Sequence, residues 1–229
     1  AEGRQGMLTP VLLVLIAAAA YVLGSVNGSI IVSRYLFHSD VRTMGSGNAG
    51  LTNFYRNYGP KGIAGVLGID IAKGVLAALI GGLVFPLATG DQALKPEYVD
   101  IGRLFAVFCL ILGHVFPVFY GFRGGKGILC GVSAVFIVDY NAGVIALVVF
   151  VLAFLLTRYV SLGSVLGTIS VPVTLLAKGF SGLCLILACL SVLLVIMKHG
   201  ENIVRIIRHK EPRFVFRRDL SHKLDEDNF

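Results

Sequence analysis

Charged residues are scarce in this chain. Asp, Glu, Lys and Arg make up 14% of its 229 residues, and hydrophobic residues make up 56%, whereas a soluble domain has about 25% charged residues. This composition argues against a soluble globular domain and predicts an all-α, polytopic integral membrane protein, with residues 1–229 forming one domain. The net charge of +7 fits contact with anionic lipid headgroups better than nucleic-acid binding.

Several chemical signatures are also missing. The four cysteines form no Cys-x-x-Cys pair, so they indicate neither a zinc site nor a disulfide framework; they are Cys109, Cys130, Cys184 and Cys189. The sequence shows no Ser-His-Asp or Cys-His set for nucleophilic catalysis, and no metal-ligand cluster. We therefore expect neither a metal nor a bound cofactor.

Long apolar runs fill most of the chain, and about 20 such residues cross a bilayer. We predict seven spans, near residues 8–33, 62–88, 104–120, 127–138, 142–157, 161–177 and 180–197. The fourth span has only about a dozen residues and could be re-entrant. The polar triplet at 139–141 predicts the turn after it; if that turn were buried, the count would be six.

The first apolar run resembles a signal peptide in part, because it contains an Ala-x-Ala sequence at residues 18–20. However, the run continues without charge to Ser33. Residues 1–6 (AEGRQG) look like a cloning remnant before a native Met7, which would leave no basic region in front of it. We therefore expect a retained membrane helix.

Basic residues set the expected orientation. With seven spans, fifteen Lys and Arg residues fall in the segments on one side and four on the other. This asymmetry predicts an outside N-terminus, an inside C-terminus and a charged cytoplasmic tail at 215–229. Three polar segments, at 40–59, 121–127 and 198–214, would then all face the cytoplasm.

The first polar segment contains a glycine-rich turn, GSGNAG, at residues 45–50. Glycines permit turns with positive φ, and successive N–H groups can bind phosphate oxygens. A helix that starts near Thr52 would add a favourable field for an anion. Candidate phosphate-binding residues are Arg42, Gly45, Gly47 and Asn48. Thr52 and Asn53 would support them, and Ser46 and the cation Arg56 lie in the same segment. The alternative is a simple interfacial connector.

The second polar segment places Lys126 among three glycines. It lacks the P-loop spacing, because Ile128 follows the last glycine. A tight turn with a lysine that snorkels to the bilayer edge is the alternative. We favour a close approach of the backbone to a ligand, with Lys126 as a catalytic cation. The candidate phosphate-binding residues here are Arg123, Gly124, Gly125 and Gly127.

The third polar segment begins with His199 and Asn202. Their spacing puts both on one helix face, which Arg205 extends. We take His199 and Asn202 as candidate site residues and Arg205 and Glu211 as supporting ones. The alternative is a basic helix that leaves the membrane among anionic lipids.

Two intramembrane charges, Asp70 and Lys73, stand one helical turn apart. Such charges are costly and are usually paired or functional, so we expect either a structural pair or support beneath a site. We expect His114 to be a hydrogen-bonded packing residue. The His-x4-Asp pattern of many glycerolipid acyltransferases occurs once, at His222–Asp227, but we set it aside because its charged surroundings give it no apolar support.

Together these motifs resemble one enzyme family. The segments at 40–59, IDIAKG at 69–74, LGHVFPVFYGFRGGKG at 112–127, RYVSLGS at 158–164 and His199…Asn202…Arg205 are similar to bacterial acyl-phosphate:glycerol-3-phosphate acyltransferases. The resemblance covers about residues 8–214. It implies a seven-helix enzyme of the bacterial inner membrane, surrounded by lipids. Separately, we expect a monomer. The residues that match the family's functional positions are Ser46, Arg56, Lys126, His199 and Asn202.

The resemblance also implies a reaction. A fatty acyl group would move from acyl phosphate to the sn-1 hydroxyl of glycerol 3-phosphate, giving lysophosphatidic acid and phosphate. An acyl phosphate is already activated, so positioning and charge neutralisation can suffice. His199 or a substrate phosphate would accept the hydroxyl proton. A transporter of organic phosphates is the alternative, although no inverted repeat is evident. A CDP-alcohol phosphotransferase would need an aspartate cluster.

Overall fold

The computed structural model describes residues 2–89 and 95–215, and the side chains from residue 10 onward. The predicted tail from residue 216 and the His222–Asp227 pattern lie outside this range. The described residues form helices and no strands. The elements are α1 (Glu2–Ser25), α2 (Gly28–Phe37), η1 (Val41–Thr43), α3 (Leu51–Tyr58), α4 (Ile63–Ala88), α5 (Pro96–Val115), η3 (Val118–Tyr120), α6 (Ile128–Val138), α7 (Tyr140–Thr157), α8 (Val160–Ala177), α9 (Gly182–Lys198) and α10 (Gly200–Ile207).

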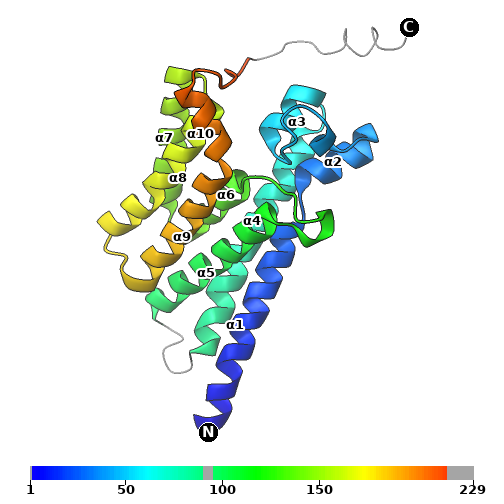
Figure 1. The fold of residues 1–229 in the computed structure, drawn as a ribbon. Coiled ribbons are helices and arrows are strands. Elements are labelled where there is room, and N and C mark those ends of the chain that lie inside the picture. The colour runs from blue at the N-terminus through cyan, green and yellow to red at the C-terminus, as the bar shows by residue number, and fades with distance from the viewer. Residues whose placement is uncertain (1, 90–94, 216–229) are drawn as a thin grey trace, which may run out of the picture.

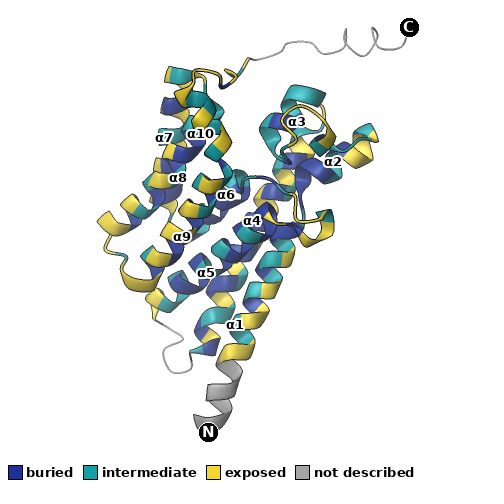
Figure 2. Ribbon diagram, in the orientation of Figure 1, coloured by how far each residue is buried: buried dark blue, intermediate teal, exposed yellow. Residues whose placement is uncertain are grey.

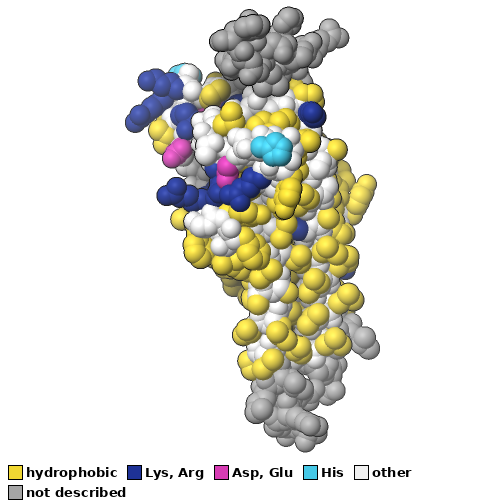
Figure 3. All heavy atoms as spheres, turned by 90° about the vertical axis from the view of Figure 1, so that its right-hand side faces the viewer, with side chains coloured by type: hydrophobic (Ala, Val, Ile, Leu, Met, Phe, Trp, Pro, Cys, Tyr) yellow, Lys and Arg dark blue, Asp and Glu magenta, His cyan; other side chains and the backbone are white. Residues whose placement is uncertain are grey.

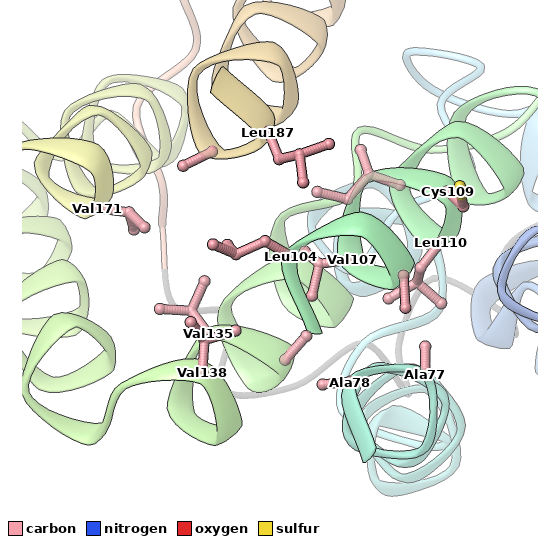
Figure 4. Close-up of a cluster of buried hydrophobic side chains, with 14 of the residues drawn as sticks. Ala77, Ala78, Leu104, Val107, Cys109, Leu110, Val135, Val138, Val171 and Leu187 are labelled. Carbon is pink, nitrogen blue, oxygen red and sulfur yellow. The ribbon is translucent and has the colours of Figure 1, made fainter. Parts of the chain in front are cut away.

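Helix α5 is the centre of the bundle. It packs against α1, α4, α6 and α9, and eleven of its twenty residues are buried. Figure 1 shows α1 and α4 on one side of α5 and α7–α10 on the other. Figure 4 shows the buried side chains that join these groups, among them Leu104, Val107 and Leu110 of α5 and Leu187 of α9. The dark blue core and yellow periphery of Figure 2 follow this arrangement.

Helices α4 and α5 approach closely at a pair of glycines. A Cβ atom on Gly81 would lie 2.1 Å from the Gly102 carbonyl oxygen, and one on Gly102 would lie 2.3 Å from the Gly81 carbonyl oxygen. Small residues allow this kind of close packing between membrane helices. The crossing therefore has no room for a side chain at either position.

Five of the described helical segments are long and apolar enough to cross a membrane. A sixth arises if α9 and α10, which meet at a 59° bend, count as one span. Helix α6 has eleven residues, too few to cross alone, since about 20 are needed. The predicted count of seven is therefore not confirmed, and the orientation derived from it stays a prediction.

Five of the seven predicted spans agree with the structure to within two residues at both ends, but two do not. Helix α5 begins at Pro96, eight residues earlier than expected, with proline in the first turn, where its missing N–H is not needed. The predicted span 8–33 is broken into α1 and α2. The expected turn at 139–141 is confirmed, since Asp139 ends α6 and caps α7 by accepting a hydrogen bond from the Ala142 amide at 2.8 Å.

The break between α1 and α2 is held by the two intramembrane charges. Lys73 lies 2.8 Å from Asp70 Oδ1, and it donates to the carbonyl oxygens of Gly24 and Val26. Asp70 Oδ1 in turn accepts a hydrogen bond from the amide of Gly28, the first residue of α2. The pair thus satisfies polar backbone groups that a continuous helix would have bonded internally.

Basic side chains gather at one end of the described part of the molecule. Figure 3 shows dark blue Lys and Arg side chains gathered near the end that carries α2 and α3, above a flank that is mostly hydrophobic. Exposed aromatic side chains, such as Tyr35 and Phe122, occur at the same end. Such a mixture is typical of the interface between hydrocarbon and headgroups.

Candidate active site

A cavity of about 770 Å³ opens at the basic end, between the three polar segments. Its polar side consists of two walls, described below, and carries Arg56, Lys126, Arg205 and further cations. Its other side is apolar and comes from α6, α7 and α8, through Ile128, Leu129, Val132, Ala146, Leu147, Phe150 and Gly167. One cavity therefore offers cations at one end and a hydrocarbon surface at the other.

Most of the predicted site residues line this cavity. They are Ser46, Gly47, Asn48, Thr52, Asn53, Arg56, Asp70, Arg123, Gly124, Lys126, Gly127, His199, Asn202, Arg205 and Glu211. Four predicted residues are not among the lining residues: Arg42, Gly45, Gly125 and Lys73. Because these four residues do not line the cavity, we assign them the role of supporting the residues that do.

The first wall of the cavity is the glycine-rich turn with the start of α3. Asn53, which is buried, organises this turn. Its amide nitrogen lies 3.0–3.1 Å from the carbonyl oxygens of Val41, Met44 and Asn48, and its Oδ1 accepts a hydrogen bond from the Ser46 amide at 3.0 Å. Because the Ser46 N–H is occupied in this way, it is not available for a phosphate.

The expected nest of free amides is thus only partly present. The amides of Gly47 and Gly50 donate to the carbonyls of Met44 and Asn48 within the turn. Helix α3 starts at Leu51, close to the predicted start, and Gly50, Leu51 and Thr52 line the cavity. The N-terminus of α3 therefore provides the anion-attracting field that we expected from this segment.

Arg42 supports the first wall from outside the cavity lining. Its guanidinium bonds to Asp40 and to the carbonyl oxygens of Tyr120 and Arg123, at 2.7 and 3.1 Å. It also lies over the Tyr120 ring, 5.8 Å from the centroid. The hydrogen bonds from Arg42 hold the pKa of Asp40 below its usual value. Arg42 therefore ties the first wall to the 121–127 loop, in contrast to the phosphate contact expected from the sequence.

The glycines of the second segment fit against the end of α5. A Cβ atom on Gly124 would lie 2.0 Å from the His114 carbonyl oxygen, and one on Gly125 would lie 2.3 Å from His114 Nε2. Gly127 has φ +79° and caps α6. The sequence suggested a close approach to a ligand, but the close approach seen is to α5, and it brings Lys126 to the cavity.

The second wall is a chain of side chains around Glu211. Lys126 donates a hydrogen bond to Asn202 Oδ1, and Asn202 donates to Glu211 Oε1 at 2.7 Å. Ser161 and Arg205 also donate to Glu211, at 2.7 and 2.8 Å. Burial opposes ionisation of Glu211, but these hydrogen bonds hold its pKa below the usual value. The carboxylate therefore stays charged and fixes Asn202 and Arg205.

Lys126 is the most perturbed cation of the second wall. Burial lowers its pKa to about 8, and the nearby Glu211 carboxylate only partly offsets this effect. An ammonium with such a pKa is less strongly solvated than a surface lysine and is ready to pair with an incoming anion.

His199 sits at the bend between α9 and α10 and is 2% exposed. Its Nδ1 lies 2.8 Å from the Val195 carbonyl oxygen. A carbonyl oxygen can only accept, so Nδ1 carries the hydrogen and Nε2 keeps a lone pair. The side chain lines the cavity, and its geometry suits a proton acceptor.

Residues 212–214 join the two walls at the cavity mouth. The Pro212 carbonyl oxygen accepts a hydrogen bond from Arg56 at 3.2 Å, and the Phe214 amide donates to the Arg158 carbonyl oxygen at 2.9 Å. The Phe214 ring stacks on Tyr55 of α3 and meets Phe154 of α7 edge-on. We call residues 212–214 the bridging segment.

Sequence reasoning missed some of the lining. Ser161 was named only as part of RYVSLGS, yet it holds Glu211. His114 was taken for a packing residue; it does bond to Lys73, at 2.8 Å, but it also lines the cavity. The apolar wall had no separate signal, because its residues look like any membrane helix. The glycine-rich loop that follows His114, at 121–127, was the available clue to its position.

The fold and cavity define an integral membrane protein with a polar site for anions beside an apolar groove. Residues 14–209 match the family model described as glycerol-3-phosphate acyltransferase, so the chain belongs to the glycerol-3-phosphate acyltransferase family. This agrees with the resemblance seen in the motifs.

Curated relatives and solved structures show the same likeness. A glycerol-3-phosphate acyltransferase of Clostridioides difficile is 38% identical over 86% of this chain and 93% of its own length. One of Aquifex aeolicus is 36% identical over 85% and 95%. The crystal structure of PlsY (YgiH), an integral membrane glycerol 3-phosphate acyltransferase, in its glycerol 3-phosphate form, matches with TM-score 0.74 and 33% identity, over 89% of this chain and 96% of that chain. Its lysophosphatidic acid form matches with TM-score 0.73 and 31% identity.

Proposed function

We propose that this protein transfers a fatty acyl group from acyl phosphate to the sn-1 hydroxyl of glycerol 3-phosphate, yielding lysophosphatidic acid and phosphate. The observation that carries this proposal is the two-sided cavity, with cations at one end and apolar helices at the other. A phosphate and a fatty chain belong to one donor molecule, and such a cavity fits both parts at once. Family membership supports the acyl acceptor and gives no support to the transport alternative.

Two phosphates must come together in this reaction, and their repulsion must be offset. Arg56 on the first wall and Lys126 on the second carry charges toward one cavity, and Arg123 and Arg205 add to them. Holding both substrates in a reactive geometry is worth up to about 7–11 kcal/mol. The hydroxyl of Ser46 and the N-terminus of α3 would hold the leaving phosphate.

The chemical step needs one proton acceptor. The glycerol oxygen attacks the carbonyl carbon, the bond between that carbon and the phosphate oxygen breaks, and the electron pair leaves with phosphate. His199 Nε2 has the lone pair to accept the hydroxyl proton; a substrate phosphate is the other acceptor. Asn202, held between Lys126 and Glu211, would orient the glycerol.

We further propose that the enzyme lies in a bacterial inner membrane with the basic end at the cytoplasm, as the Lys and Arg asymmetry predicts. Water-soluble glycerol 3-phosphate would enter there, and the acyl chain would enter from the lipid. We also propose that the enzyme acts as a monomer, since one chain supplies all of the candidate catalytic residues. Among the described residues no group of three His, Cys, Asp or Glu side chains could hold a metal. These residues therefore offer no ligand set for a metal-dependent phosphotransferase.

The test is incubation of purified protein with acyl phosphate and glycerol 3-phosphate without added metal, and with acyl-CoA as a parallel donor. We expect lysophosphatidic acid from acyl phosphate and little or none from acyl-CoA. Equal activity with acyl-CoA would refute the proposed donor. Movement of glycerol 3-phosphate across a vesicle membrane without acyl product would favour the transport alternative.

A further inference from the structure

His114, at the end of α5, is a cavity-lining side chain that the proposed mechanism does not use. It is 4% exposed, and its two ring nitrogens have different surroundings. Nδ1 faces Lys73 at 2.8 Å. Nε2 lies on the other edge of the ring, beside the backbone of the 121–127 loop, where a Cβ atom on Gly125 would be 2.3 Å away.

The neighbours of Lys73 fix the hydrogen on His114. Besides His114, Lys73 Nζ contacts one carboxylate oxygen, from Asp70, and the carbonyl oxygens of Gly24 and Val26. All three are acceptors, so the nitrogen among them is a donating ammonium without a lone pair. Nδ1 of His114 therefore cannot donate to it and instead accepts a share of one of its three hydrogens, which places the single hydrogen of the neutral imidazole on Nε2.

The Nε2–H group has no acceptor within the described part of the protein. The hydrogen bonds of His114 side-chain atoms there are limited to the one with Lys73. A buried donor is normally satisfied by protein, water or ligand. Because His114 lines the substrate cavity, an oxygen inside that cavity is the available acceptor.

The surroundings indicate which kind of oxygen this is. Asp70 lines the same cavity and is paired with Lys73 at 2.8 Å, so this corner offers an anion no net positive charge. The phosphate groups have cations elsewhere, at Arg56 and Lys126. An uncharged oxygen, either the acyl carbonyl or a glycerol hydroxyl, suits a neutral N–H donor beside a carboxylate.

We propose that His114 is a further substrate-contacting residue, whose Nε2–H donates a hydrogen bond to an uncharged substrate oxygen, and that Lys73 with Asp70 positions it by fixing its tautomer. This inference rests on the proposed function. If the oxygen is the acyl carbonyl, the bond strengthens as negative charge develops there, as at an oxyanion hole.

A matched pair of variants separates this role from a structural one. In His114→Asn, the amide oxygen stands near the place of Nδ1 and still accepts from Lys73, but nothing donates from the place of Nε2. In His114→Gln, the amide reaches the place of Nε2 and can donate, but the acceptor for Lys73 is lost. We expect His114→Asn to unfold at the wild-type temperature with turnover lower by about 100-fold, and His114→Gln to keep more of the turnover.

The kinetic constants identify the oxygen. A lower kcat with both KM values unchanged indicates the acyl carbonyl, and a higher KM for glycerol 3-phosphate indicates a glycerol hydroxyl. If His114→Asn keeps kcat and both KM values within about twofold, or is the more active of the pair, then His114 only accepts from Lys73 and the proposal fails. Wild-type turnover in the same assay tests the proposed function separately.

A spectroscopic measurement keeps the test independent of variant folding. In wild-type protein with ¹⁵N-labelled histidine, we expect the His114 signals of an Nε2–H tautomer, and a shift of the Nε2–H proton when both glycerol 3-phosphate and a stable acyl phosphonate bind. An Nδ1–H or doubly protonated ring would contradict the proposal, as would an unshifted Nε2–H signal in the substrate complex.

Discussion

The two polar walls line the same cavity but are built differently. The first wall, around Asn53, is held by neutral amide and carbonyl groups. The second wall, around Glu211, is held by charged groups, with Lys126, Asn202 and Arg205 in one chain of hydrogen bonds. The comparison shows that one wall derives its shape from dipoles and the other from ionised side chains. Changes of charge and pH should therefore act mainly on the second wall.

The largest expected effect comes from removal of the cation of the second wall. We expect Lys126→Ala to abolish measurable turnover, a loss of at least about 1000-fold, while the protein folds and inserts. Lys126→Arg should recover only part of the rate, because a planar guanidinium does not replace a compact ammonium. Steady-state kinetics measure this, with Lys61→Ala as the control at an exposed position outside the cavity. Near-normal activity of Lys126→Ala would reduce the loop to a structural turn.

His199→Gln should have the next largest effect. Glutamine reaches the place of Nε2, but its amide cannot accept a proton, so we expect a loss of about 100- to 10,000-fold in kcat, with glycerol 3-phosphate affinity partly kept. Kinetics and equilibrium binding of glycerol 3-phosphate measure the two parts. A loss of affinity alone would reassign His199 to binding and leave a substrate phosphate as the proton acceptor.

On the first wall, Asn53→Ala should release the turn. The carbonyl oxygens of Val41, Met44 and Asn48 would lose a buried partner, at a cost of about 1–3 kcal/mol in the free energy of unfolding. Since Ser46 and Arg56 would then be less well placed, we expect a KM increase of about 10-fold or more, with an unchanged pH profile. Asn141→Ala, at an exposed position of α7 outside the cavity, is the control. A changed pH profile in Asn53→Ala would show that the two walls are not independent.

The smallest expected effect is the alkaline limb of the pH profile. The pKa of Lys126 is lowered to about 8 by burial, so the free enzyme loses this charge as the pH rises through that value. We expect kcat/KM to fall by about 10-fold for each pH unit above it. In Lys126→Arg the residual activity should lack this limb, because guanidinium stays charged. The same limb in both proteins would assign the titration to another group.

The sequence predicted the site better than it predicted the membrane crossing. Glycines, amides and cations stand out in an apolar chain, so the three polar segments were visible, and the structure brings all of them to one cavity. The break at Val26 and Asn27 was not visible, because both apolar runs continue through it. It depends on Lys73 and Asp70, some 45 residues away in sequence, which a local pattern cannot report.

The role of each residue in the polar segments was also harder to predict than whether its segment contributes to the cavity. Arg42 looked like a phosphate ligand because it is basic, but Asp40, two residues earlier, occupies it. The glycines beside Lys126 were attributed to a ligand, yet α5 is what approaches them. In both cases composition was informative, and the partner that determined the role lay elsewhere in space.

The short bridging segment limits how far apart the two walls can lie at the cavity mouth. Glu211 is anchored in the second wall, and three residues later Phe214 contacts Tyr55 of the first wall. An extended residue spans about 3.3–3.6 Å, so the opening at the cavity mouth is limited by peptide length as well as by packing. A single residue inserted after Glu211 would lengthen the bridging segment by about 3.3–3.6 Å and so allow a wider opening. A single deletion would draw Arg56 and Glu211 toward each other.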